Sequence, residues 1–284
     1  MRLRTQFLVR FGYLGDRFAG VQPLRDRPTA GGAVHDRIAT AFGSPPKALC
    51  FSARTDRGVH ALDNLATFHV VDEGDHVARA ARAVEAPRDD GLTFVRVSQV
   101  SRHVHARGIA RGKRYRYTVD DRAADADDPH HPIARFSWRI APELDVERAR
   151  RAARLLVGER DFRSFRSGPE TGASPVRTIE HILVRGPYPL DDGARRTFIE
   201  VRGDGFLRKM VRNIAGLLVE VGTGWRDVDD VPRILAARDR SALGLTAPAG
   251  GLTLLEVRVP FARGAAPIDD DAARALSARD LSEA

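Results

Sequence analysis

A compact polar loop between two apolar stretches contains the residues best suited to chemistry in this chain. The apolar stretches cover residues 47–52 and 65–70, and the loop between them holds Asp56 with Arg54 before it and Arg57 after it. Nearby cations favour the ionised form of a carboxyl group, which keeps it available as a nucleophile or base. The loop is therefore a candidate site for carboxylate chemistry. Asp-x-Gly is also an ordinary turn signal, in which the aspartate only bonds backbone amides, and the spacing alone favours this structural role.

A second segment, residues 101–118, combines positive charge with rings. It contains no acidic residue. Cations that can bind phosphate next to rings that can stack on bases are typical of RNA-binding surfaces. The pattern equally fits a solvated edge strand whose rings face inward. Its cations are Arg102, Arg107, Arg111, Lys113, Arg114 and Arg116, and its rings are His103, His105, Tyr115 and Tyr117.

A third segment, residues 203–216, has the spacing of an amphipathic helix. Arg208 and Arg212 are four residues apart and share a face, which in most helices is only a solvated stripe. Its Gly-x-Gly does not complete the six-residue dinucleotide fingerprint, so nucleotide binding is not indicated.

Composition limits the class of protein. The chain has 284 residues, 43% of them hydrophobic, and a formal net charge of +8. Its 46 basic residues are arginines except Lys47, Lys113 and Lys209. Arginine suits forked contacts with phosphate, so we expect a polyanionic partner. A single cysteine, Cys50, excludes an internal disulfide and a zinc site built on several thiolates. We expect a cytoplasmic protein with no membrane span and no metal site.

Hydrophobic periodicity predicts the same element order in both halves: strand, helix, strand, strand, helix, strand. In the first half we expect strands at 3–13, 47–52, 65–70 and 92–97, a short helix ending at Gly43, and a helix that buries Val77, Ala80, Ala81 and Val84. In the second half we expect strands at 115–119, 179–184, 196–201 and 252–259, with helices at 146–157, 206–221 and 231–237.

This doubled order predicts an α+β fold of two ferredoxin-like halves. Because sequential strands tend to be neighbours, we expect both halves to join into one mixed, largely antiparallel sheet, with helices on one face and an RNA-binding catalytic cleft on the other. The halves would cover residues 1–104 and 105–261. Residues 262–284 carry little apolar material and are expected to form a flexible tail.

The three segments resemble one family, the tRNA pseudouridine synthase A family. Residues 53–61, ARTDRGVHA, are similar to its catalytic loop, residues 105–117 to its H-A-R…K/R-x-Y-x-Y run, and residues 205–216 to its G-F-L-x-x-M-V-R-N-I-x-G run. Shorter matches at 158–166, 177–179 and 246–252 follow in the family's order. The chain departs from the pattern at Leu14, Val21 and Thr253, outside the catalytic loop.

The resemblance implies a role for each site residue. Asp56 falls on the nucleophile, Arg212 on the arginine that pairs with it, and Tyr115 on the tyrosine that stacks against the target uracil. Arg54 falls on the residue that occupies the space left by a flipped base, an extrusion that chemistry on a stacked base requires. The expected RNA-binding residues are Arg54, Thr55, His60, Arg102, Arg107, Arg111 and Lys113.

The resemblance also implies the reaction and the partners of the chain. The chain would convert uridine to pseudouridine in tRNA, in the anticodon stem-loop around positions 38 to 40, as a homodimer and without metal or cofactor. The alternative is an RNA-binding protein of the same fold without catalysis, in which Asp56 only shapes a turn. A glycosidase with a carboxylate nucleophile would need a second carboxyl group, and these motifs contain none in a suitable place.

Overall fold

The computed structural model describes residues 4–71, 75–86, 90–124, 126, 128, 135–169 and 172–260. These residues form two compact units. One consists of residues 4–111 together with 254–260, and the other is Gly112–Thr253. The expected tail, residues 262–284, lies outside the described residues. The division into domains at residues 104 and 105 stays a prediction, because compact packing does not test whether either half folds alone.

The first unit follows the predicted order. Its sheet runs β4-β1-β3-β10, and β2 pairs with β3. Strand β1 is antiparallel to both β3 and β4. The elements are β1 (Thr5–Tyr13), α1 (Ala30–Phe42), β2 (Lys47–Phe51), β3 (His60–Val70), α2 (His76–Glu85), β4 (Leu92–Val100) and the greater part of β10 (Leu252–Arg258).

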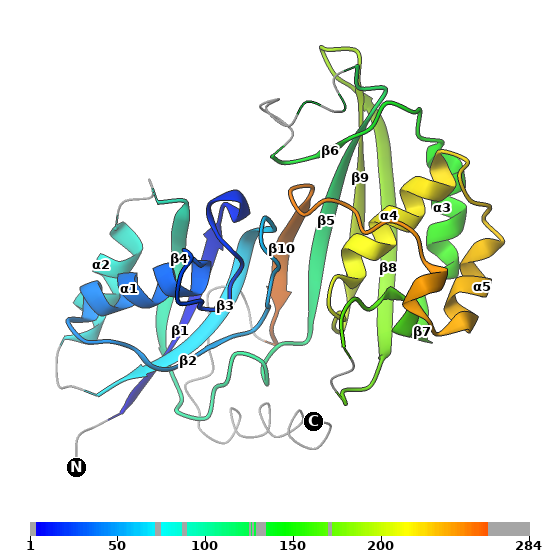
Figure 1. The fold of residues 1–284 in the computed structure, drawn as a ribbon. Helices are drawn as coiled ribbons and strands as arrows, with labels where there is room; N and C mark the ends of the chain where they lie inside the picture. The colour runs from blue at the N-terminus through cyan, green and yellow to red at the C-terminus, as the bar shows by residue number, and fades with distance from the viewer. Residues whose placement is uncertain are drawn as a thin grey trace. The chain divides into compact units, whose positions relative to one another are not determined.

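Both helices of this unit pack on the same sheet face (Figure 1). The Phe7 ring of β1 lies 5.0 Å from the ring of Phe42 in α1 and 5.5 Å from that of His76 in α2. Helix α1 begins after Thr29, whose hydroxyl accepts a hydrogen bond from the Gly32 N–H. It ends at Gly43, where a φ of +70° favours glycine.

The predicted buried face of α2 is wrong. Val77 is 80% exposed, Ala81 is exposed, and Ala83 is fully buried. The sequence of α2 is rich in alanine, and small side chains define its rotation weakly. The His76 ring packs against Phe7 and Phe42, whereas Val77 lines an open hollow with Phe7 and Val95 and therefore stays exposed.

The second unit repeats the order with additions, but the strand predicted to close it, β10, belongs mostly to the first unit. Its sheet runs β5-β9-β8-β7 in antiparallel pairs, and the short β6 pairs with β5 in parallel. Strands β6 and β7 were not predicted. The elements are β5 (Gly112–Asp121), β6 (Trp138–Arg139), α3 (Val146–Leu155), β7 (Gly158–Asp161), β8 (Val176–Pro189), β9 (Arg195–Gly203), α4 (Met210–Gly222) and α5 (Asp230–Ala237).

Helix α3 packs as predicted and contacts both β8 and α4 (Figure 1). Its stripe of Val146, Ala149, Ala153 and the adjoining Leu156 is buried. Helix α4 begins at Met210, four residues later than predicted, because Lys209 adopts a φ of +60° and breaks the helical path.

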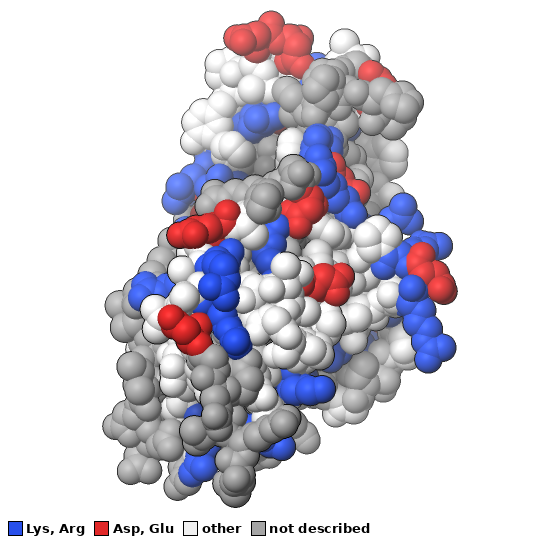
Figure 2. Space-filling view, turned by 90° about the vertical axis from the view of Figure 1, so that its left-hand side faces the viewer, with Lys and Arg blue, Asp and Glu red and all other residues white. Residues whose placement is uncertain are grey.

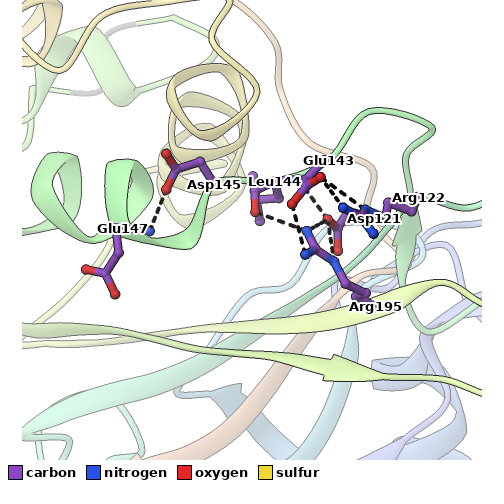
Figure 3. A network of polar contacts seen from close by, with 7 residues as sticks. All are labelled: Asp121, Arg122, Glu143, Leu144, Asp145, Glu147 and Arg195. Carbon is purple, nitrogen blue, oxygen red and sulfur yellow. Dashed lines mark hydrogen bonds and ion pairs between the residues drawn. The ribbon is translucent and has the colours of Figure 1, made fainter.

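A polar network at the end of β5 holds the loop that leads into α3 (Figure 3). The buried Asp121 carboxylate accepts from Arg195 of β9 and from the Leu144 N–H, 2.8 Å away. Arg195 also donates to Glu143 at 3.0 Å. The Asp121 carboxylate raises the pKa of Arg195, so this guanidinium stays charged.

The α+β class and the largely antiparallel pairing are therefore confirmed. Each unit places its helices against one face of its own strands.

Candidate active site

The loop that carries Asp56 spans residues 52–59, between β2 and β3. Strand β3 begins at His60, so the loop is shorter than the sequence suggested. Its tip is a turn in which the Val59 N–H donates to the Asp56 carbonyl at 3.2 Å. Gly58 has a φ of +82°, which a type II turn requires at its third position. The turn reading and the catalytic reading of Asp56 are therefore compatible.

Residues at both ends of this loop are fixed. The Ala53 N–H donates to Asn64 Oδ1 at 3.2 Å, and Asn64 Nδ2 donates back to the Ala53 carbonyl at 3.0 Å. At the other end, the Gly15 N–H donates to Nδ1 of His60 at 3.1 Å. The chain on either side of Asp56 is thus held by core residues.

The predicted residues of the loop differ in exposure. Arg54 and Arg57 are exposed, and Thr55 and Asp56 are half-buried. His60 is only 3% exposed. An RNA contact by His60 would require access to a buried ring, and it stays a prediction.

The basic segment does not form an edge strand over its full length. Residues 101–110 form turns that pack on the first unit through the buried Val104, Ala106 and Ile109. The Ala106 N–H donates to the Thr67 hydroxyl of β3, and the Val104 carbonyl accepts from Gln6. The segment is therefore attached to the sheet through alternate apolar residues and presents the intervening polar ones outward.

The predicted cations of this segment are not equivalent. Arg102 and Arg107 are exposed. Arg111 is half-buried, and its guanidinium donates to the carbonyls of Gly108 and Ala110. Arg102 and Arg107 are consequently the better placed of the three to meet a phosphate.

The face of the molecule in Figure 2 shows no single basic patch among the residues that the structure describes. Lys and Arg side chains are spread across it with Asp and Glu among them. Net charge therefore does not locate an RNA surface on this face.

Tyr115 and Lys113 lie in the second unit, on β5. Tyr115 is 7% exposed, and its ring meets Phe206 edge-to-face with 5.4 Å between centroids. Lys113 is half-buried near the start of the strand. Tyr117 is on the same face as Tyr115, fully buried, and donates to the Pro248 carbonyl at 2.8 Å. Burial raises the pKa of Tyr117, so its hydroxyl stays protonated.

Arg212 lies in the first turn of α4. Its Nε donates to the Ala247 carbonyl at 2.7 Å, and the Ala247 N–H donates to the Arg212 carbonyl at 3.2 Å. The neighbouring Asn213 donates to the Phe165 carbonyl and accepts from the Thr246 hydroxyl. The helix start is therefore held by two loops of the same unit. The Arg212 charge lowers the pKa of Tyr117 on β5 and so opposes the larger effect of burial.

The structure places Arg54, Thr55 and Asp56 in one loop of the first unit and His60 at the start of the adjoining β3. It places Tyr115 and Arg212 on β5 and α4 of the second unit. Sequence reasoning missed Tyr13 and Asn64, which hold the Asp56 loop. A signal for Asn64 was available, because it is a polar residue in an apolar strand. Tyr13 matches the tyrosine of the family's Tyr-Asp-Gly pattern, from which the chain departs at Leu14, but no role was predicted for it.

Within the part of the chain that the structure describes, no helix is long and apolar enough to cross a membrane. That same part has no group of three or more His, Cys, Asp or Glu residues placed to hold a metal ion.

Comparison with known proteins identifies the family. A family model described as tRNA pseudouridine synthase matches residues 152–260. The tRNA pseudouridine synthase A of Pseudomonas aeruginosa is 35% identical over 250 residues, covering 87% of this chain and 83% of the relative. That of Acetivibrio thermocellus is 34% identical over 245 residues, covering 86% and 96%.

Likeness to solved structures is weaker. A chain in the crystal structure of a Cbf5-Nop10-Gar1 complex aligns with a TM-score of 0.32 and 12% identity, over 75% of this chain and 45% of that one. This likeness is too slight to argue from. The sequence relatives, each matched over most of its length, are sufficient: this chain belongs to the tRNA pseudouridine synthase A family, a family of isomerases.

Proposed function

We propose that the protein isomerises uridine to pseudouridine in tRNA and that Asp56 is the nucleophile. The observation that carries this proposal is the Asp56 loop. A half-buried carboxylate lies between two exposed arginines, on a turn held at both ends by core residues. This loop has the family's sequence, and the chain belongs to the family.

The reaction rearranges bonds within one nucleotide. The C1′–N1 glycosidic bond breaks, uracil turns while bound, a C1′–C5 bond forms, the C5 proton is lost and N1 gains a proton. The net change is an isomerisation, so no redox partner is needed. Asp56 would attack the ribose C1′ or the uracil ring, or stabilise a transient glycal, and in each case the reacting form is the carboxylate.

The other residues have complementary roles in the proposal. Arg54 occupies the space that the flipped nucleotide leaves and contacts its phosphate, for which its planar guanidinium is suited. Tyr115 stacks on the uracil, and its phenol oxygen takes the C5 proton as the phenol gives its own proton to water. Arg212 keeps Asp56 ionised.

The substrate contacts would extend along the basic segment. The proposal assigns RNA binding to Thr55, His60, Arg102, Arg107, Arg111 and Lys113. It also makes the protein a cytoplasmic homodimer that acts on the anticodon stem-loop around positions 38 to 40. The family resemblance supports these finer assignments.

The test is to incubate the purified protein with unmodified tRNA transcripts and to map pseudouridine at each uridine. We expect pseudouridine at positions 38 to 40 and release of tritium from uridine labelled at C5. Binding of tRNA without either product would instead support a non-catalytic RNA-binding protein. Modification only at other positions would retain the enzyme and reject the proposed site on tRNA.

A further inference from the structure

Two buried residues outside the catalytic-loop motif reach into it from the core of the first unit. Asn64 is fully buried on β3, and Tyr13 is 4% exposed at the end of β1. The register of β1 and β3 shifts between them: Phe11 pairs with Asn64, whereas Tyr13 pairs with Ala61. A register shift of this kind changes the direction in which side chains point at the end of a strand pair. Here it lies beside the loop that carries Asp56.

Asn64 continues the β2-β3 ladder by one residue. The regular pairing ends with Phe51 opposite Ala66 and the Ser52 N–H bonded to the Leu65 carbonyl. Beyond that point the Asn64 side chain acts as the partner strand. Its Oδ1 accepts from Ala53 and its Nδ2 donates to Ala53, so one amide satisfies both backbone groups of that residue.

A third Asn64 hydrogen bond fixes the orientation of this amide. The Leu65 N–H also donates to Asn64 Oδ1, at 2.8 Å. Two N–H donors converge on the oxygen and one carbonyl faces the nitrogen, so a carboxylate at this position could not reproduce the set.

Tyr13 holds the loop nearer to the nucleophile. Its hydroxyl lies 2.7 Å from the Thr55 hydroxyl, and Thr55 directly precedes Asp56. Burial raises the pKa of Tyr13 well above its usual value, and hydrogen bonds with Thr55 and Asn64 oppose that shift. The phenol therefore stays protonated and keeps a hydrogen to share.

The Thr55 backbone is held as well. Its carbonyl accepts from the Val21 N–H at 3.4 Å. Gly20 has a φ of +99°, and a Cβ at that position would lie 2.8 Å from the same carbonyl. The chain at residue 20 can therefore approach the loop this closely only as glycine.

We propose that Asn64 and Tyr13 are positioning residues for the isomerisation, and that they hold the backbone on the N-terminal side of Asp56 in its reactive geometry. This inference rests on the proposed role of Asp56. Neither residue touches the substrate in this scheme. Asn64 acts through Ala53, and Tyr13 acts through Thr55.

The kinetic consequence follows from the position of these contacts. Loosening them lets the carboxylate move relative to a bound nucleotide, and a displacement of about 1 Å can cost on the order of 100-fold in rate. Arg54 lies on this loop, whereas the exposed Arg102 and Arg107 lie on the segment of residues 101–110. Because Arg102 and Arg107 would still bind tRNA, the effect should appear mainly in kcat, with a smaller change in KM for tRNA.

The test compares Asn64→Ala and Tyr13→Phe with two matched controls. Ser164→Ala removes a buried hydroxyl that bonds the Ile234 carbonyl and the Asp239 N–H in the second unit. Tyr188→Phe removes a phenol hydroxyl from a half-exposed tyrosine of β8. The readouts are kcat and KM for tRNA, measured below the melting transition of every variant, and amide hydrogen exchange of residues 52–59.

We expect kcat to fall at least about tenfold in Asn64→Ala and severalfold in Tyr13→Phe, with KM changed by no more than about twofold, as for interactions that act only in the transition state. Amides of residues 52–59 should exchange faster in both variants. The controls should keep native kcat and native exchange in the loop.

The inference is overturned if Tyr13→Phe and Asn64→Ala both keep the native kcat. An equal loss in Ser164→Ala also overturns it, because the effect would then report general destabilisation. If Asn64→Ala does not fold, Tyr13→Phe alone decides. Absence of turnover in the wild-type protein is a failure of the proposed function, and hydrogen exchange of the loop then still reports whether these residues hold it.

Discussion

Arg212 and Ala247 hold each other by a reciprocal pair of hydrogen bonds: Arg212 Nε to the Ala247 carbonyl, and the Ala247 N–H to the Arg212 carbonyl. The flanking residues extend this interaction. Thr246 donates to Asn213, and the Pro248 carbonyl accepts from Tyr117. The family-like run at 246–252 thus serves as the support of the family-like helix start at 210–214. The two runs, which match the family at separate places in the sequence, therefore pack against each other in the fold.

Asp56→Asn is expected to abolish turnover while preserving the fold and tRNA binding. Asparagine is nearly isosteric and keeps an oxygen, but it cannot act as an anionic nucleophile. The measurement is tritium release from C5-labelled uridine in tRNA, with melting temperature and tRNA affinity alongside. Asp36→Asn, which changes a carboxylate with an 81% exposed side chain on α1, is the control and should retain full activity. Near-native tritium release by Asp56→Asn would remove Asp56 as the nucleophile.

Tyr115→Phe should separate stacking from proton transfer. The ring and its edge-to-face contact with Phe206 remain, so tRNA binding should persist. Turnover should fall if the hydroxyl takes the C5 proton, with a loss of about 100-fold or more as is typical of general acid–base catalysis. The measurement is single-turnover rate beside tRNA affinity. Native rate in this variant would restrict Tyr115 to stacking, and Tyr188→Phe controls for removal of a phenol hydroxyl elsewhere.

The double variant Arg102→Gln and Arg107→Gln should weaken tRNA binding and flatten its salt dependence. Both side chains are exposed on the segment held by Thr67. Removing one phosphate-binding cation should reduce the slope of log affinity against log salt by about 1. Filter binding at a series of KCl concentrations measures the slope. The charge-matched control is the double variant Arg233→Gln and Arg238→Gln, at arginine side chains that are 78% and 65% exposed. Parallel lines for wild type and the Arg102, Arg107 double variant would exclude this segment from the binding surface.

Acid should destabilise the protein in part through Glu143 and Asp192. Hydrogen bonding with Arg122 lowers the pKa of Glu143, and hydrogen bonding with Arg139 lowers that of Asp192. A carboxyl group whose pKa is lower in the folded state stabilises the fold above its unfolded pKa. That contribution disappears as pH falls through the folded pKa. The relevant window therefore lies below the ordinary pKa values of 4.5 for Glu143 and 3.8 for Asp192.

Melting temperatures of wild type, Glu143→Gln and Asp192→Asn between about pH 7 and about pH 3 test this account. Each variant should melt below wild type at neutral pH, and the difference should shrink as pH falls. Tyr188→Phe, which removes no carboxyl group, should show no such convergence. A difference that stays constant with pH would show that packing, and not charge, sets the effect of the variants.

Much of the fold followed from local patterns. The position of β1, the fourfold spacing of Val34, Ile38 and Phe42 in α1, and the buried stripe of α3 each depend on residues close in sequence. These patterns arise from the side-chain periodicity of strands and helices. The alternation of β1 did not predict its burial, because both faces of the strand are buried from Phe7 to Tyr13. The exposure of Val77 on α2 did not follow either, because the rings of β1 and α1 pack against His76 instead.

The candidate site likewise combines features set by local sequence with features set by tertiary contacts. The sequence by itself determined the residue types of the Asp56 loop, its glycine turn and the family to which they belong, because these are properties of a continuous stretch. Only the tertiary structure decided that His60 is buried, that Asn64 completes the backbone of Ala53, and that Tyr13 reaches Thr55 across 42 positions. Such contacts depend on strand register and on a local register shift, and no short stretch of sequence encodes either.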